Sequence, residues 1–372
     1  MKIIFINILK FALRVIYAPI KLFKTKNRIV YLSRQSNTKS LDMELLEKAI
    51  KDEDSSVEQV FRLKMIDDSL ADKFKYCFRL IGDMYYIATS KIAILDTYSI
   101  PISCLKHKKS LKVVQIWHAL GAVKKFGLQS LDTEDGRSKE ISKAMCMHKN
   151  YDYVIAPSPA TAKFYMEGFG VEANKIKICP MPRVDYLLDC ETKSSEFFSL
   201  NPDMADKKIV LYLPTYREKD KYIAQQIKVE FEDNQNYQLI VNSHPLSTIK
   251  REDKFSFNGD FSTFDLIKIA DIIITDYSAC AFEAALLMKP LYFFVPDYDE
   301  YEVKRGLNVN IKEELPNYVF EEADKLLENI NSQTYDICEL YKFKDKYIKA
   351  KDSNNTQKLA KFILMLVNKK GE

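Results

Sequence analysis

The stretch ADIIITDYSACAFEAALLMKPLYFFVPDYDEYEVKRG, residues 270–306, decides the fold of this chain. Its apolar run Ile272–Ile274 is short and β-branched, as expected for a strand that is buried in a parallel sheet. The polar turn 275–278 supplies residues that begin a helix, and Ala279–Met288 is predicted to be that helix. Leu291–Val295 is predicted to be a second strand. Strand, turn, helix and strand form a βαβ unit, and its turn lies at the edge where open parallel sheets bind ligands.

The turn 275–278 is predicted to hold a phosphate or a pyrophosphate. Free N–H groups and the dipole at the start of a helix favour an anion there, and the hydroxyls of Thr275 and Ser278 add donors. An ordinary capped helix explains the same residues and is the commoner case for a turn of this kind.

Length, charge and cysteine content narrow the classes of protein. The 372 residues suffice for about two domains. A net charge of +4, from 56 basic and 52 acidic residues, argues against a dedicated nucleic-acid binder. The seven cysteines are odd in number and form no CxxC pair, so reduced thiols in a cytosol and no zinc site are expected. The nine glycines form no GxGxxG or Walker-type loop.

The first 28 residues combine apolar and basic side chains and contain no acid. The positive charges interrupt the apolar run before it reaches the roughly 20 residues of a membrane span, and no small-residue cleavage site follows. We therefore predict an amphipathic helix that lies on an anionic cytoplasmic leaflet. A first helix that packs on the protein's own core is the alternative.

Strand and helix patterns alternate along the rest of the chain and predict parallel α/β sheets. Further strands are predicted at residues 29–32, 57–63, 86–90, 93–96, 112–116, 151–157, 175–179, 208–213 and 237–242. Further helices are predicted at residues 41–51, 160–168, 262–269, 321–330, 336–349 and 356–368. The polar, weakly patterned stretch 189–207 is expected to link two domains. The helix 356–368 is basic and apolar, so it is expected either to pack across the domains or to touch a membrane.

Two histidines follow predicted strands directly. Trp117 and His118 come directly after the predicted strand 112–116, and His244 comes two residues after the predicted strand 237–242. Side chains at the carboxyl ends of parallel strands face the ligand, and an imidazole accepts a proton near neutral pH. A histidine whose bonds are satisfied inside the structure is the alternative for His118.

Two basic residues are further candidates for phosphate binding. Arg183 offers a planar fork of donors that suits a phosphate, with a surface pair to Asp185 as the alternative. Lys124 is either a solvated surface charge or a residue that faces a phosphate.

Together these motifs resemble those of the CDP-glycerol glycerophosphotransferase family, the polyol-phosphate transferases of teichoic acid synthesis. Besides the opening stretch, the matching motifs are VVQIWHALGAVKKFG (113–127), PRVDYL (182–187), VLYLPTYRE (210–218) and VNSHPL (241–246). They fall in the family's order and cover roughly residues 29 to 310.

The resemblance implies an α/β fold of GT-B architecture, in which two Rossmann-like domains face an interdomain cleft, with an added N-terminal amphipathic helix. The expected ranges are a membrane-associating helix at 1–28, an acceptor domain at 29–188, a CDP-donor domain at 206–345, and a C-terminal helix that crosses the domains at 346–372.

The implied reaction moves glycerol phosphate or ribitol phosphate from a CDP-polyol to a polyprenyl-diphosphate-linked acceptor and releases CMP. No cofactor and no metal are expected, and the enzyme is expected to be peripheral on the cytoplasmic face of the membrane. The sequence does not decide whether the protein forms a homo-oligomer. One alternative is a GT-B glycosyltransferase of cell-wall or capsule synthesis, in which Glu283 or Asp276 grips the ribose of a nucleotide sugar. A non-catalytic membrane adaptor that kept the fold is another.

Carried over by motif, His118 matches the family's proposed catalytic base, and His244 matches the second histidine of its site. The residues implied to bind the donor or its phosphates are Thr215, Arg217, Thr275, Asp276, Ser278 and Arg305, to which Lys124 and Arg183 are added. Ala119 stands where the family has a glycine, and Val184 stands where it has an asparagine. Either departure is consistent with a different polyol or acceptor.

Overall fold

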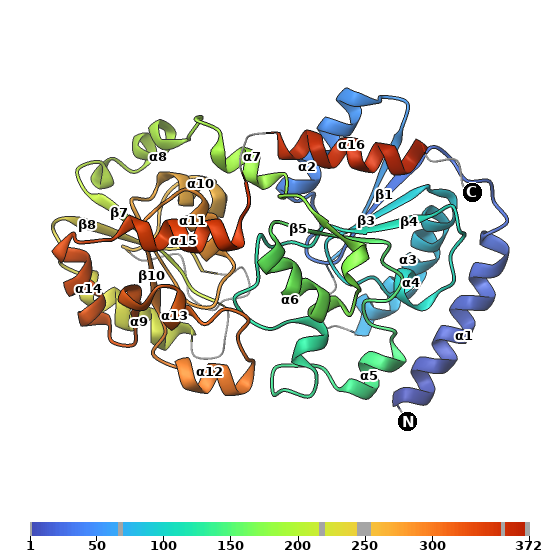
Figure 1. The fold of residues 1–372 in the computed structure, drawn as a ribbon, viewed down its shortest axis with the longest axis horizontal. Coiled ribbons are helices and arrows are strands. Elements are labelled where there is room, and N and C mark those ends of the chain that lie inside the picture. The colour runs from blue at the N-terminus through green and yellow to red at the C-terminus, as the bar shows by residue number, and fades with distance from the viewer. Residues whose placement is uncertain (1, 66–69, 216–219, 244–253, 351–353, 369–372) are drawn as a thin grey trace. The chain divides into compact units, whose positions relative to one another are not determined.

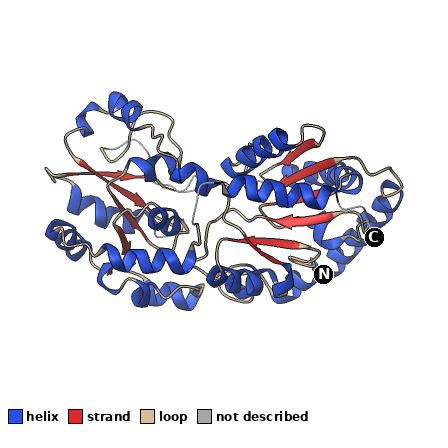
Figure 2. Ribbon diagram, turned by 45° about the horizontal axis from the view of Figure 1, so that its top comes forward, coloured by secondary structure: helices blue, strands red, loops and turns tan. Residues whose placement is uncertain are grey.

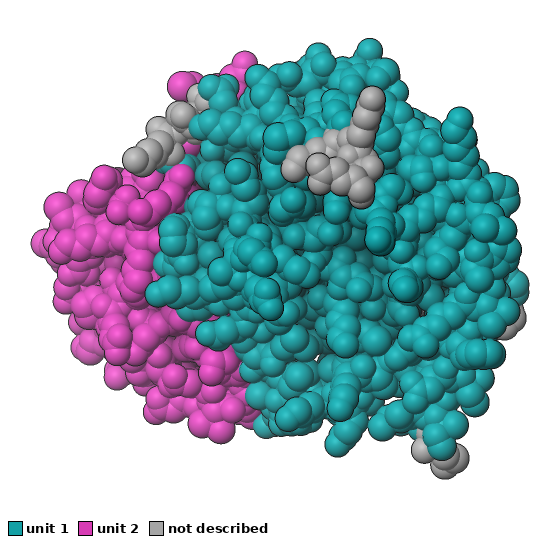
Figure 3. Space-filling view, turned by 45° about the vertical axis from the view of Figure 1, so that its right-hand side comes forward, with its two compact units in different colours: residues 1–118, 126–185, 350–372 teal, residues 119–125, 186–349 magenta. Residues whose placement is uncertain are grey.

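The computed structural model describes residues 2–65, 70–215, 220–243, 254–350 and 354–368. The chain divides into two compact units (Figure 3). The first unit gathers residues 1–118, 126–185 and 350–372, and the second gathers residues 119–125 and 186–349. The ranges expected from the sequence are contiguous, whereas each unit is assembled from separate segments.

The first unit is built on a six-stranded parallel sheet with the order β2-β1-β3-β4-β5-β6. Its strands are β1 (Arg28–Ser33), β2 (Glu58–Leu63), β3 (Ile92–Leu95), β4 (Lys112–Gln115), β5 (Tyr153–Ala156) and β6 (Ile176–Ile178). Its helices are α1 (Lys2–Ile20), α2 (Leu41–Glu53), α3 (Leu70–Thr89), α4 (Ile100–Cys104), α5 (Lys139–Ala144), α6 (Pro159–Phe169) and α16 (Asn355–Asn368), and α7 (Arg183–Leu188) begins in it. Helices lie on both sides of the strands (Figure 2).

The C-terminal helix α16 packs beside α2 on this first sheet (Figure 1). Its apolar residues Leu359, Ile363 and Val367 belong to the same buried cluster as Ile29 of β1. The spacing of four residues places these side chains on one face of the helix. Of the two alternatives given for this helix, packing on the protein is therefore the one that its buried apolar face supports.

The strand predicted at 86–90 is wrong, because α3 continues to Thr89. Leu80, Met84, Ile87 and Ala88 are all buried, and their spacing is that of one helical face. The aromatic and β-branched residues at 86–87 are typical of a short strand, which led to the wrong prediction. Across the whole segment the buried apolar residues recur every three to four positions, which favours a helix.

The second unit is built on a five-stranded parallel sheet with the order β11-β10-β9-β7-β8. Its strands are β7 (Lys208–Leu213), β8 (Tyr237–Val241), β9 (Ile272–Thr275), β10 (Leu291–Phe294) and β11 (Val319–Phe320). Its helices are α8 (Ser194–Leu200), α9 (Asp220–Phe231), α10 (Thr263–Ile269), α11 (Cys280–Leu286), α12 (Tyr298–Lys304), α13 (Ile311–Glu314), α14 (Ala323–Ser332) and α15 (Ile337–Tyr347). The predicted βαβ unit is confirmed as β9, α11 and β10.

The stretch 189–207, expected to be a linker, is folded into the second unit. It forms α8, whose Phe197 is fully buried and packs edge to face on Phe261, with ring centroids 5.3 Å apart. A helix of seven residues with one anchoring aromatic is too short for its period to stand out in a polar sequence.

Helix α1 confirms the predicted N-terminal helix. Its buried residues are Leu13 and Tyr17, whereas most of its other apolar side chains are exposed. Among the described helices it alone is long and apolar enough to cross a membrane, judged by length and composition.

Candidate functional site

The order of strands in the first unit marks where a ligand belongs. The chain steps from β1 to β2 on one side and then returns to place β3 on the other side of β1. Ligands of open parallel sheets bind outside the carboxyl ends of the strands at such a reversal. Here the reversal lies between the ends of β1 and β3, where Arg34 follows the first strand and Asp96 follows the other.

His118 follows β4, the strand beside β3, and its ring is fixed at this same edge. Its Nδ1 lies 2.8 Å from the backbone oxygen of Asp96. Because a carbonyl oxygen only accepts, Nδ1 carries the proton and donates it. The other nitrogen, Nε2, is then left as the basic atom, and the Gln35 amide nitrogen lies 3.2 Å from it. The alternative of a structural histidine fits the same contacts, with Nδ1 bonded to the Asp96 carbonyl and the Gln35 amide nitrogen near Nε2.

The residue before His118 has an uncommon backbone conformation. Trp117 has a φ of 61°, which is rare for a bulky residue. Its N–H donates to the side-chain oxygen of Gln115 at 2.9 Å, and its ring packs on Phe126 with centroids 5.0 Å apart. Such conformations persist where surrounding contacts enforce them, and they cluster at functional sites. The turn thereby aims the His118 ring back toward the end of β3.

Arg183 lies directly beneath this turn, in a buried ion pair. Its Nε and Nη2 donate to Oδ2 of Asp42 at 2.9 and 2.5 Å, and its backbone N–H donates to Oδ1 at 2.8 Å. Nη2 also donates to the backbone oxygen of His118 at 3.0 Å. Arg183 thus positions His118.

The Arg183–Asp185 surface pair offered as the alternative does not describe this site. Arg183 is buried with Asp42, and the Asp185 carboxylate accepts bonds from Asn355 and Thr356 at the start of α16.

A cluster of basic side chains surrounds the ends of β1 and β2 and was missed from the sequence. Arg34, Arg62, Lys64 and Arg79 line one small pocket, in which Arg62 pairs with Asp83 at 2.8 Å. Burial and the neighbouring Arg62 lower the pKa of Arg79. The Nε of Arg34 is buried and has no hydrogen-bond partner among the residues that the structure describes. This excess of positive charge at the carboxyl edge of the first sheet suits an anion.

Asp96 is a buried acid at the same edge. Within the described ranges its Oδ1 has no hydrogen-bond partner. Burial raises the pKa of Asp96 to about 7, against the opposing effect of bonds from Ser33 and Thr97. Burial therefore favours the protonated form of this carboxyl group.

The second unit has a strand reversal of its own, between β7 and β9. Asp276, fully buried after β9, accepts from the backbone N–H and the hydroxyl of Thr215 at 2.9 and 2.6 Å, and from Tyr277 N–H at 2.6 Å. Thr275 donates its hydroxyl to the Leu213 carbonyl at 2.8 Å. These three predicted donor-binding residues tie the two strand ends together and shape the loop around them.

Ser278 lies at the more open end of that turn. It is half-buried, and its hydroxyl accepts the Cys280 N–H at 3.3 Å, at the start of α11. The neighbouring Tyr277 is buried; its ring stacks on Tyr301 at 3.7 Å between centroids, and its hydroxyl donates to Asp297 at 3.1 Å. Tyr277 thus fixes the turn through its buried ring, whereas Ser278 stays partly exposed.

The segment 119–125, directly after His118, packs within the second unit. The Lys125 N–H donates to the Gly306 carbonyl at 2.9 Å, and Arg305 Nε donates to the Lys125 carbonyl at 3.2 Å. The Asn308 side chain donates to the Lys124 carbonyl at 3.2 Å. Lys124 and Arg305, both predicted to bind phosphate, are therefore brought into one neighbourhood.

Two predicted site residues, His244 and Arg217, lie outside the described residues. Within the described ranges no group of three or more His, Cys, Asp and Glu side chains is placed to hold a metal ion.

Three comparisons place these features among known proteins. The family model described as CDP-glycerol:poly(glycerophosphate) glycerophosphotransferase matches residues 15–365. The chain is 29% identical over 327 residues to the teichoic acid ribitol-phosphate primase of Bacillus spizizenii, covering 84% of each protein. It is 31% identical over 302 residues to the teichoic acid glycerol-phosphate primase of Bacillus subtilis, covering 78% of this chain and 77% of that one.

Among solved structures, the wall teichoic acid polymerase TagF matches with a TM-score of 0.74 at 17% identity, over 97% of this chain and 95% of that one. A putative UDP-N-acetylglucosamine 2-epimerase from Listeria monocytogenes matches with a TM-score of 0.57 at 12% identity, over 93% and 98%. At these identities the likeness shows a shared fold.

Proposed function

Because this chain belongs to the CDP-glycerol:poly(glycerophosphate) glycerophosphotransferase family, we propose that it is a polyol-phosphate transferase of teichoic acid synthesis. It transfers glycerol phosphate or ribitol phosphate from a CDP-polyol to a lipid-linked acceptor and releases CMP. Both of the relatives described above are primases for one of these two polyols, which supports this donor class.

One observation carries the proposed chemistry: His118 is fixed at a ligand-binding edge with a basic Nε2. The Asp96 carbonyl holds Nδ1 as a donor, so Nε2 is the ring nitrogen that takes the proton in this proposal. A terminal hydroxyl of the acceptor attacks the phosphorus that carries the polyol, while His118 accepts the hydroxyl proton. The new oxygen–phosphorus bond forms, the bond from that phosphorus to the CMP oxygen breaks, and CMP leaves.

The donor, in this proposal, is held by the second unit. Ser278, Arg305 and Lys124 supply donors and charge to the diphosphate, and His244 and Arg217 are assigned to the same task from their motifs. Thr215, Thr275 and Asp276 shape the loop, which follows from their bonds to one another and to the backbone. Offsetting the phosphate charge is the main demand of phosphoryl transfer. The proposal requires no cofactor.

The acceptor is proposed to bring a phosphate of its own to the basic cluster beside His118. Arg34, Arg62 and Arg79 offer guanidinium groups there, which match phosphate oxygens in geometry. The helix α1 is proposed to keep the enzyme on the cytoplasmic face of the membrane as a peripheral protein, where a lipid-linked acceptor resides.

The test is CMP release from CDP-glycerol and CDP-ribitol with a defined lipid-linked acceptor. His118→Ala is expected to lower turnover about 100-fold or more, as for loss of a general base. His118→Asn is the matched control for folding, because its amide still donates to the Asp96 carbonyl but lacks a basic nitrogen. We expect both variants to melt like the wild type and to be equally slow. Near wild-type turnover by His118→Asn would remove the proposed base.

The same assay with UDP-sugars distinguishes the glycosyltransferase alternative. We expect CDP-polyols alone to raise the melting temperature and to yield a free nucleotide. UDP release from a UDP-sugar, with no CMP from either CDP-polyol, would overturn the proposed donor class.

A further inference from the structure

Helix α1 presents a broad apolar face to solvent. Ile4, Phe5 and Phe11 are 65–68% exposed, and Leu22, just past the end of the helix, is 87% exposed. Soluble proteins rarely leave a continuous apolar patch of this kind uncovered. On the opposite side, Leu13 and Tyr17 are buried against the first unit, so the helix has a fixed orientation.

Tyr17 fixes α1 to the rim of a cavity in the first unit. Its hydroxyl lies 2.9 Å from Nδ1 of His107, whose Nε2 lies 2.8 Å from the Ile102 carbonyl. Since the carbonyl only accepts, Nε2 donates and Nδ1 accepts the Tyr17 hydroxyl. Burial lowers the pKa of His107, which favours the neutral form of its ring. The apolar face of α1 is thereby held in a set position beside the cavity.

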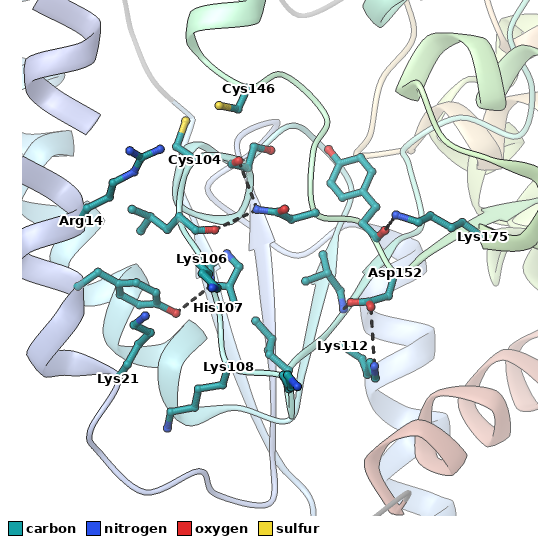
Figure 4. Close-up of a pocket in the computed structure, with 18 residues that line it drawn as sticks. Arg14, Lys21, Cys104, Lys106, His107, Lys108, Lys112, Cys146, Asp152 and Lys175 are labelled. Atoms are coloured by element: carbon teal, nitrogen blue, oxygen red, sulfur yellow. Dashed lines mark hydrogen bonds and ion pairs between the residues drawn. The ribbon is translucent and has the colours of Figure 1, made fainter. Parts of the chain in front are cut away.

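The cavity has a volume of about 1000 Å³ and is surrounded by positive charge (Figure 4). Arg14 and Lys21 lie on one side of it, and Lys112 and Lys175 lie on the other. Asp152 is the single acid among the described residues that line it. Its carboxylate is 3.8 Å from Lys112 Nζ and accepts the Val113 N–H, so it offsets little of the charge.

Several of these cations have no acidic partner among the described residues. Within the described part of the chain, no ion pair is formed by Arg14, Lys21, Lys106 or Lys109. Lys108 donates to the Phe23 carbonyl, and burial lowers its pKa. Like charges around one cavity repel one another, and an anion in the cavity relieves that repulsion.

This cavity is separate from the site of phosphoryl transfer. It lies at the amino ends of the strands, because Lys112 begins β4 and Asp152 precedes β5. His118 follows the other end of β4, and the strand alone spans about 10 Å, because three steps of roughly 3.3 Å separate Lys112 from Gln115. The charge here therefore serves a different ligand.

We propose that this cavity binds the phosphate headgroup of an anionic membrane lipid while the apolar face of α1 lies among the acyl chains. The inference rests on the membrane placement in the proposed function. A lipid headgroup joins a phosphate to an apolar tail, and the structure sets a cationic cavity directly beside an exposed apolar helix. Basic residues at an anionic leaflet strengthen binding by amounts that add for each lysine.

Vesicle sedimentation tests the proposal with phosphatidylcholine alone and with an equimolar mixture of phosphatidylcholine and phosphatidylglycerol. The wild type is expected to bind the mixture at least about 10-fold more tightly. Lys106→Gln with Lys109→Gln is expected to weaken that binding by about 10- to 30-fold, as for two lysines at an anionic surface. Lys48→Gln with Lys51→Gln on α2 removes the same charge outside the cavity and is expected to change it by less than about threefold.

Three outcomes would overturn the proposal. They are equal binding to both kinds of vesicle, equal losses in the two double variants, and full competition by inorganic phosphate, which would assign the cavity to a soluble anion. Melting curves confirm that the variants are folded. CMP release from a soluble acceptor analogue is measured alongside: its absence from the wild type would defeat the proposed function and leave the vesicle result standing.

Discussion

Removing the Asp42 carboxylate is expected to destabilise the first unit strongly. Asp42 is 2% exposed, and it receives three bonds from Arg183, which is 7% exposed. In Asp42→Ala the guanidinium stays charged, because arginine does not lose its proton in proteins, so a buried cation loses its partner. Breaking a buried pair from one side costs about 3–5 kcal/mol.

The cost converts to a melting temperature through the size of the unit. For a unit of about 200 residues, each 1 kcal/mol corresponds to roughly 2–4 °C, so Asp42→Ala is expected to lower the melting temperature by about 6–20 °C. Glu44→Ala is the matched control, because this exposed acid lies on the same turn of α2. It is expected to change stability by at most about 0.5 kcal/mol.

Activity gives a second measure of the same contact. Arg183 also holds the His118 carbonyl, so we expect Asp42→Ala to lower the turnover of CMP release even at temperatures where the variant is folded. Circular dichroism melts measure the loss of stability. Initial rates taken roughly 15 °C below each melting midpoint measure the turnover of the folded variant. A variant that melts within about 1 °C of Glu44→Ala and keeps wild-type turnover would refute the role given to this pair.

Two further predictions concern buried acids. Asp96 has its pKa raised from 3.8 to about 7, so the stability tied to its neutral form is fully present below about pH 4 and is lost as the pH rises through 7. Asp96→Asn is therefore expected to be more stable than the wild type, by an amount that grows from pH 5 to pH 8 and reaches up to about 4 kcal/mol. A difference in melting temperature between the two proteins that does not change with pH would contradict this. Asp276→Ala leaves the buried N–H groups of Thr215 and Tyr277 without their acceptor. We therefore expect the free energy of unfolding to fall by about 3–5 kcal/mol and calorimetry to show weaker binding of CDP-glycerol. Asp276→Asn is expected to be intermediate, because it keeps one acceptor oxygen. Equal melting of wild type and Asp276→Ala would show that the loop is held by other contacts.

Local patterns predicted those parts of the structure that depend on neighbouring residues. The run Ile272–Ile274 and the Pro290 break were sufficient for β9, α11 and β10, because burial on both faces and helix termination are encoded within a few residues. The position of His118 after β4 followed in the same way.

Contacts between distant segments were not predictable from local patterns. Arg183 and Asp42 are 141 residues apart, and nothing near either residue indicates the other. The basic cluster of Arg34, Arg62 and Arg79 depends on β2 lying beside β1, which is a property of strand order. Site roles that rest on such contacts require the fold before they are visible.

The segment 119–125 has a practical consequence for dividing this protein. A fragment that starts at residue 186 would contain the whole second sheet but would lack the strip of backbone that bonds to Gly306 and Asn308. Phe282 would also lose the close approach of Gly121, where a Cβ atom would come within 2.4 Å of its ring. Truncation at the apparent boundary therefore exposes apolar surface and unpaired peptide groups. We expect the isolated second unit to stay soluble only when residues 119–125 are supplied with it, either joined to it by circular permutation or co-expressed as a separate peptide.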